Sequence, residues 1–146
     1  MTYLRWGSIS LCLFVVSLTA TAQSSVDELV ARGQELFHAD IGCRVCHADT
    51  GAGLVGPSLL FGPTPADIFD QLESNPVMGV IVSEMDPSDE DLAAISMYIR
   101  TLAGLPLEEG MAEQWLTSLT AVKNNQADRL EFDKTPRDLQ VETIER

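Results

Sequence analysis

The sequence predicts an all-α fold formed by one small domain. In four segments, apolar residues recur at the three- and four-residue spacing of one helix face. Three of these segments begin with a residue that can cap a helix. The chain shows almost no alternation of apolar and polar residues of the kind that predicts a β-strand. The chain of 146 residues, 45% of them hydrophobic, suffices for one domain and leaves little room for a second.

Residues 1–22 are predicted to be a secretory signal. Arg5 supplies a positive charge, residues 9–18 are nearly all apolar, and residues 20–22 are small, as at a cleavage site. The alternative is an uncleaved membrane anchor, but the apolar run is shorter than the ~20 residues that a span requires. We therefore expect an exported, periplasmic chain with no stable membrane insertion after cleavage.

The first helix is predicted over residues 26–38. Ser25 and Glu28 form a capping-box pattern at its start. Its apolar residues share one face: Val26, Leu29, Val30, Leu36 and Phe37. Glycines and prolines then punctuate residues 42–63, which predicts a loop long enough to wrap around a ligand.

Two further helices follow this loop. The second begins at Thr64, with Pro65 in its first turn, and ends at Asn75. The third begins with Asp86 as its cap and ends at Gly104. Each has an apolar side, formed by Ile68, Phe69 and Leu72 in the second and by Leu92, Ile95, Ile99 and Leu102 in the third.

Residues 107–146 are predicted to be an acidic extension of a domain that spans residues 23–106. Met111, Trp115, Leu119 and Val122 recur on one face and predict a fourth helix over residues 108–122, followed by a loose tail. We expect this helix to fold back on the domain. The alternative is a docking arm around Trp115 that binds a larger oxidoreductase.

The segment Cys43-Arg44-Val45-Cys46-His47 predicts covalent haem attachment. Two thiols at this spacing can add to the two vinyl groups of haem, and His47 is placed to bind the iron. A disulfide would be the ordinary interpretation of two cysteines in an exported chain. However, so short a loop gains little stability from a disulfide, and a disulfide does not account for the adjacent histidine.

Two other interpretations of this motif have less support. A thioredoxin-like redox pair requires a strand before the motif and a helix after it. A zinc site requires more ligands than the sequence offers.

Residues 29–105 resemble a class I monohaem c-type cytochrome. The resemblance rests on residues 33–37 (GQELF) before the haem motif, 56–59 (GPSL) after it, and 89–92 (DEDL) leading to 97–99 (MYI). It implies that the first and last helices of the domain cross at Gly33, against the segment around Tyr98. It also implies that the carbonyl of Pro57 accepts a hydrogen bond from His47, which orients the imidazole.

A chain with few aromatic residues needs help to build a core, and an enclosed haem would provide it. The apolar residues expected around the haem are Phe37, Leu59, Leu60, Phe61, Phe69 and Tyr98.

The sixth iron ligand is expected to be Met78. Seven residues separate it from the predicted cap at Asp86, similar to the connection in the family. Met85 directly precedes that cap and would pack as a hydrophobic staple. Met85 remains the alternative, because a cap at Ser88 would weaken this argument and the Met-Pro pair common in the family is absent.

Three further candidates for this ligand have less support. His38 lies only nine residues before His47 and is not expected to reach the opposite haem face. Met97 is expected to pack between helices, and Met111 lies beyond the matched region.

The charge of the chain limits its partners. Nine Lys and Arg residues stand against 22 Asp and Glu, for a net charge of −13, which disfavours binding to nucleic acid or anionic membranes. We expect a soluble periplasmic carrier of single electrons, without enzymatic turnover, that docks on a basic redox protein. The alternative is a haem c subunit permanently associated with a periplasmic dehydrogenase or oxidoreductase complex.

Overall fold

The computed structural model describes residues 25–134, and within this range the chain is helical with no strand. The prediction of an all-α fold is confirmed. The predicted signal at residues 1–22 lies outside the described residues. The six helices are α1 (Val26–Phe37), α2 (Arg44–His47), α3 (Pro65–Ser74), α4 (Gly79–Met85), α5 (Asp89–Leu102) and α6 (Met111–Lys134).

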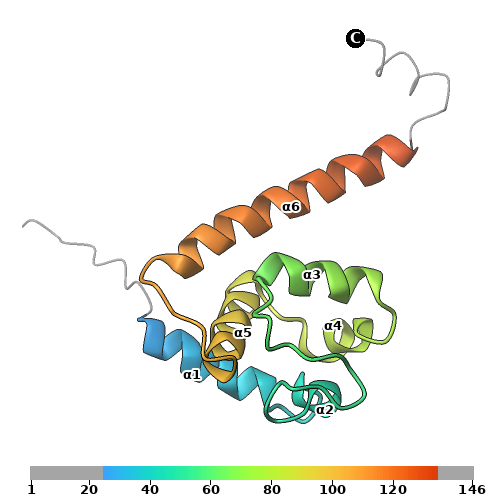
Figure 1. Ribbon diagram of the computed structural model, residues 1–146. Coiled ribbons are helices and arrows are strands. Elements are labelled where there is room, and N and C mark those ends of the chain that lie inside the picture. Colours follow the sequence, from blue (N-terminus) through green and yellow to red (C-terminus); the bar gives the residue numbers. More distant parts are fainter. Residues whose placement is uncertain (1–24, 135–146) are drawn as a thin grey trace, which may run out of the picture.

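Helices α1 and α5 form the central packing of the domain and cross each other (Figure 1). A Cβ built on Gly33 of α1 would lie 1.9 Å from the carbonyl oxygen of Ala94 and 2.9 Å from Cβ of Tyr98. Only a residue without a side chain permits this approach. The expected crossing at Gly33 is therefore present.

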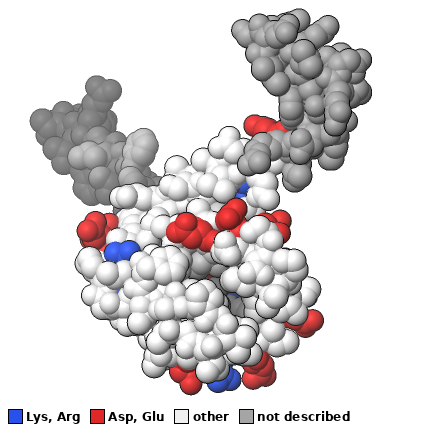
Figure 2. Space-filling view, turned by 45° about the vertical axis from the view of Figure 1, so that its right-hand side comes forward, with Lys and Arg blue, Asp and Glu red and all other residues white. Residues whose placement is uncertain are grey.

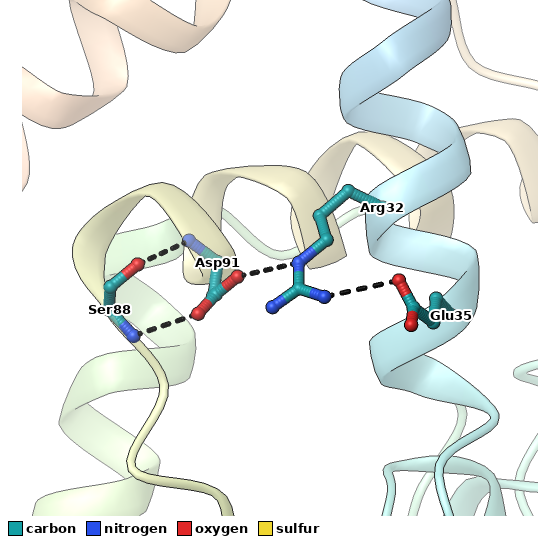
Figure 3. Close-up of polar contacts among 4 residues, drawn as sticks. All are labelled: Arg32, Glu35, Ser88 and Asp91. Carbon is teal, nitrogen blue, oxygen red and sulfur yellow. Dashed lines mark hydrogen bonds and ion pairs between the residues drawn. The ribbon is translucent and has the colours of Figure 1, made fainter.

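A polar chain of contacts also ties α1 to the start of α5 (Figure 3). Arg32 donates from Nε to Asp91 at 3.0 Å and from Nη1 to Glu35 at 3.1 Å. The other carboxylate oxygen of Asp91 accepts from the backbone N–H of Ser88 at 3.2 Å. The hydrogen bond that Arg32 donates to Asp91 is the main reason that the pKa of Arg32 is raised above its ordinary value.

Helix α5 begins later than predicted, because Ser88 and not Asp86 is its N-cap. Ser88 and Asp91 form a complete capping box, in which the side chain of each accepts from the backbone of the other. Asp86 instead ends α4, a helix that was not predicted, and adopts a left-handed conformation with φ of 42°. Met85 is consequently the last residue of α4 and not a staple before α5.

Helix α6 starts at Met111 and continues to Lys134, so the predicted bounds of 108 and 122 are wrong at both ends. Asn124 and Asn125 do not end it. The helix packs against α3 and α5, and its Leu119 is fully buried in the same core as Phe37 of α1. The first half of α6 is therefore an integral part of the domain, whereas its C-terminal end runs past α3 (Figure 1).

Candidate functional site

A cavity of about 460 Å³ lies between α2, α3, α5 and the segments that connect them. This volume is in the range of ordinary ligand sites. The lining is mostly apolar, and it includes Ile41, Val45, Val55, Leu59, Ile68, Leu72, Val77, Val80, Ile81, Leu92, Ile95 and Ile99. Cys43, Cys46, His47, Pro57 and Met78 line the same cavity. The structure thus brings three separate parts of the predicted site together: the cysteine motif, Pro57 and Met78.

The cysteine motif is held at the cavity by the loop that follows it. Both cysteines are half-buried, and they are not joined by a disulfide. The carbonyl of Cys46 accepts hydrogen bonds from the backbone N–H groups of Leu54, Val55 and Gly56, at 3.2, 3.0 and 2.8 Å. These bonds turn the loop back onto the motif and bring Pro57 close to His47.

His47 is only 5% exposed, and its Nδ1 lies 2.7 Å from the carbonyl oxygen of Pro57. Because a carbonyl can only accept, Nδ1 must carry the hydrogen. The neutral imidazole then keeps an unprotonated Nε2, the form in which histidine binds a metal ion. The bond between His47 and Pro57, which the family resemblance implies, is present in the structure.

Gly56 is a site residue that the sequence-based prediction missed. A Cβ built on it would lie 2.7 Å from Cε1 and 2.9 Å from Nδ1 of His47. The backbone at Gly56 therefore packs directly against the imidazole. Its position immediately before Pro57 was the available signal, since a glycine beside a functional residue often marks a close backbone approach.

We expect the substitution Gly56→Ala to displace the imidazole of His47 and to lower the free energy of unfolding by about 1–3 kcal/mol, the usual range for an overpacked site. Thermal unfolding followed by circular dichroism measures this loss. Gly79→Ala is the control, because a Cβ there meets only Leu72 O at 3.6 Å, an ordinary contact. Equal stability of the two variants would show that no such contact constrains His47.

Of the methionines in residues 25–134, Met78 alone lines the cavity. Met78 is the N-cap residue of α4 and lies at the point where the chain turns after α3. Met85, at the other end of α4, is half-buried and lies outside the lining. Met97 is fully buried within α5.

Phe37 and Tyr98, which were predicted to lie in the haem pocket, are not among the residues that line the cavity. The two rings pack edge to face, with centroids 5.4 Å apart, at the crossing of α1 and α5. The Tyr98 hydroxyl lies within hydrogen-bond distance, 2.9 Å, of Nε2 of His38. The ring of His38 therefore has a partner at the helix crossing, and His38 does not line the cavity. Burial raises the pKa of Tyr98, and the charge of Asp49 raises it further.

Of the other residues predicted to surround the haem, one lines the cavity and three do not. Leu59 lines the cavity. Leu60 and Phe61 are 39% and 71% exposed, and Phe69 packs beneath α6 instead. Phe37, Tyr98 and Phe69 pack between helices, and the cavity is lined mainly by aliphatic residues.

The structure also bears on the other interpretations of the motif. No strand precedes Cys43 within the described residues. Burial raises the pKa of the Cys43 thiol to about 11, whereas reactive thioredoxin-like cysteines have a lowered pKa. Across residues 25–134, no group of three or more His, Cys, Asp or Glu side chains is arranged to hold a metal ion.

The part of the chain that forms the cavity is acidic in its overall composition. Residues 25–106 contain 13 acids and three arginines. Arg32 binds Asp91 and Glu35, Arg44 binds the backbone carbonyl of His38, and Arg100 binds that of Pro106. Figure 2 shows one face of the molecule, on which acidic side chains outnumber basic ones.

Within the part of the chain that the structure describes, no helix combines the length and the apolar character needed to cross a membrane.

No protein-family model, curated protein or solved structure matches this chain. The functional argument therefore depends on the geometry of the cavity and on the residues that line it.

Proposed function

We propose that the cavity holds one haem c, attached through Cys43 and Cys46, and that the protein is a class I monohaem c-type cytochrome that carries single electrons. His47 and Met78 would bind the iron. The observation that carries the proposal is that all four side chains line one apolar cavity, although Met78 is 31 residues from His47 in the sequence.

The residues of the site fit this group by their chemistry. A bound haem supplies an iron that gains or loses one electron. Cys43 and Cys46 offer thiols for two thioether bonds, and His47 offers Nε2, with its ring held by Pro57. The aliphatic walls from α3 and α5 keep water away, and a histidine–thioether pair raises the reduction potential relative to two histidines.

The test is to express the full chain, with its leader, in a host that matures c-type cytochromes. Intact mass should show loss of residues 1–22 and gain of one haem, and the haem should stay attached after denaturation. Its absorption in alkaline pyridine should match a haem with two thioether links. A purified, folded chain without covalent haem would end the proposal.

The proposed cellular place and partner are supported by the predicted export signal and by the net negative charge of the chain. The carrier would work in the periplasm and meet a redox protein with a basic docking surface. The alternative is a haem c subunit permanently bound within a dehydrogenase or oxidoreductase complex. In that case α6, which extends past α3 (Figure 1), would contact the larger partner.

Ionic strength distinguishes these two functions. For a free carrier, the rate of electron transfer to a basic partner should fall as salt rises, because surface charges are screened beyond about 8 Å at physiological ionic strength. Stopped-flow kinetics at several salt concentrations measure this dependence. A neutral partner of the same fold is the control, and rates independent of salt with basic partners would favour the permanent complex.

A further inference from the structure

Helix α6 contacts α5 through polar side chains at two places, one near each end of α5, and the two helices run antiparallel. Near the C-terminal end of α5, the guanidinium of Arg100 lies 5.9 Å from the centroid of the Trp115 ring. Near the N-terminal end of α5, the ammonium of Lys123 forms an ion pair with Asp89. Leu119 lies between these points on α6 and is fully buried.

The Lys123 contact differs from the Arg100 contact because it joins three helices. Besides Asp89 of α5, the Lys123 ammonium lies 4.8 Å from the centroid of the Phe69 ring on α3. A cation at this distance from an aromatic face is attracted to it. One side chain from α6 therefore holds α3 and the start of α5 together.

These two helices form a wall of the cavity. Ile68, adjacent to Phe69, lines the cavity from α3 together with Leu72, and Leu92, one turn after Asp89, lines it from α5. The chain leaves α3 through Asn75 and reaches Met78, and both of these residues also line the cavity.

We propose that Lys123 is a positioning residue for the cavity. This proposal rests on the function proposed above. By holding the ring of Phe69 on one side of α3, it fixes the rotation that directs Ile68 and Leu72 to the cavity side. It thereby fixes where α3 ends and where Met78 begins α4. Residues beyond the cytochrome-like region, in α6, would thus control how firmly the sixth ligand is held.

Three variants of the haem-loaded full chain test this role. Lys123→Met removes the charge but keeps a long apolar side chain. Lys123→Arg restores a cation and should behave as the unmodified protein. Arg100→Met is the matched control, because it removes one cation from the same pair of helices at the end away from Asp89 and Phe69.

The first measurement is the rate at which imidazole replaces the sixth ligand of the oxidised protein. We expect about a fivefold increase in Lys123→Met, from the usual strength of one partly exposed cation–π contact and one ion pair. Lys123→Arg and Arg100→Met should stay within about twofold of the unmodified protein. Equal rates in Lys123→Met and Arg100→Met would overturn the proposal.

The second measurement is amide hydrogen exchange, which does not require haem. In Lys123→Met, exchange in residues 68–78 should rise about fivefold while exchange in α1 stays unchanged. A uniform rise over the whole domain, or no rise, would overturn the positioning role even in a chain that carries no haem. A chain that lacks haem but shows the local rise would overturn the proposed function and leave the link between α6 and α3 established.

Discussion

Replacement of both Cys43 and Cys46 by serine is expected to abolish covalent haem attachment and to deplete the folded population. A serine hydroxyl is slightly smaller than the thiol and does not form a thioether. An unfilled cavity of about 460 Å³ with aliphatic walls would then remain. Its walls would lose packing contacts, which should cost several of the ~5–15 kcal/mol that stabilise a typical domain.

Thermal and urea unfolding, followed by circular dichroism, measure this loss, and intact mass reports the haem. The single variants Cys43→Ser and Cys46→Ser are the internal controls, since each keeps one thiol and should retain partial attachment. A double variant that accumulates as a stable, haem-free monomer with cooperative unfolding would contradict the claim that the core depends on a bound group.

Met78→Ala is expected to abolish the weak long-wavelength sulfur-to-iron absorption of the oxidised protein. The substitution removes the only methionine sulfur at the cavity lining in the described residues, while both thioether links remain. The reduction potential should fall and small ligands should gain access to the iron. Absorption spectra and a potentiometric titration of the purified protein measure these effects.

Met85→Ala is the matched control for this prediction. It removes a half-buried methionine from the opposite end of α4, outside the cavity lining. We expect it to keep the absorption and to lose about 1 kcal/mol of stability, less than a fully buried methionine would. If the absorption instead survives in Met78→Ala and disappears in Met85→Ala, the assignment of the ligand is wrong.

Helix starts with a local signal were predictable from the sequence. Ser25 with Glu28 and Thr64 with Asp67 each satisfy orphan backbone N–H groups within four consecutive residues, so no distant contact is needed. The motif at residues 43–47 is equally local, because its cysteines and His47 lie within five residues. The approach of α1 to α5 at Gly33 was also expected, from the resemblance to cytochromes.

Competition between neighbouring signals was harder to resolve. Asp86 and Ser88 are both residue types that favour the N-cap position. Ser88 is the N-cap of α5 in the structure, because Asp86 already ends α4. Likewise, Asn124 and Asn125 are weak helix formers, yet α6 passes through them.

The sequence alone determined the helical class, the starts of α1 and α3 and the local cysteine–histidine motif at residues 43–47, because these depend on residues within one or two turns of each other. Only the tertiary structure decided which side chains meet at the cavity. Phe37 and Tyr98 have the apolar character of pocket residues, but the close crossing at Gly33 places them against each other. Gly56 at the face of His47 and Met78 at the cavity likewise depend on how loops and helices distant in sequence pack together.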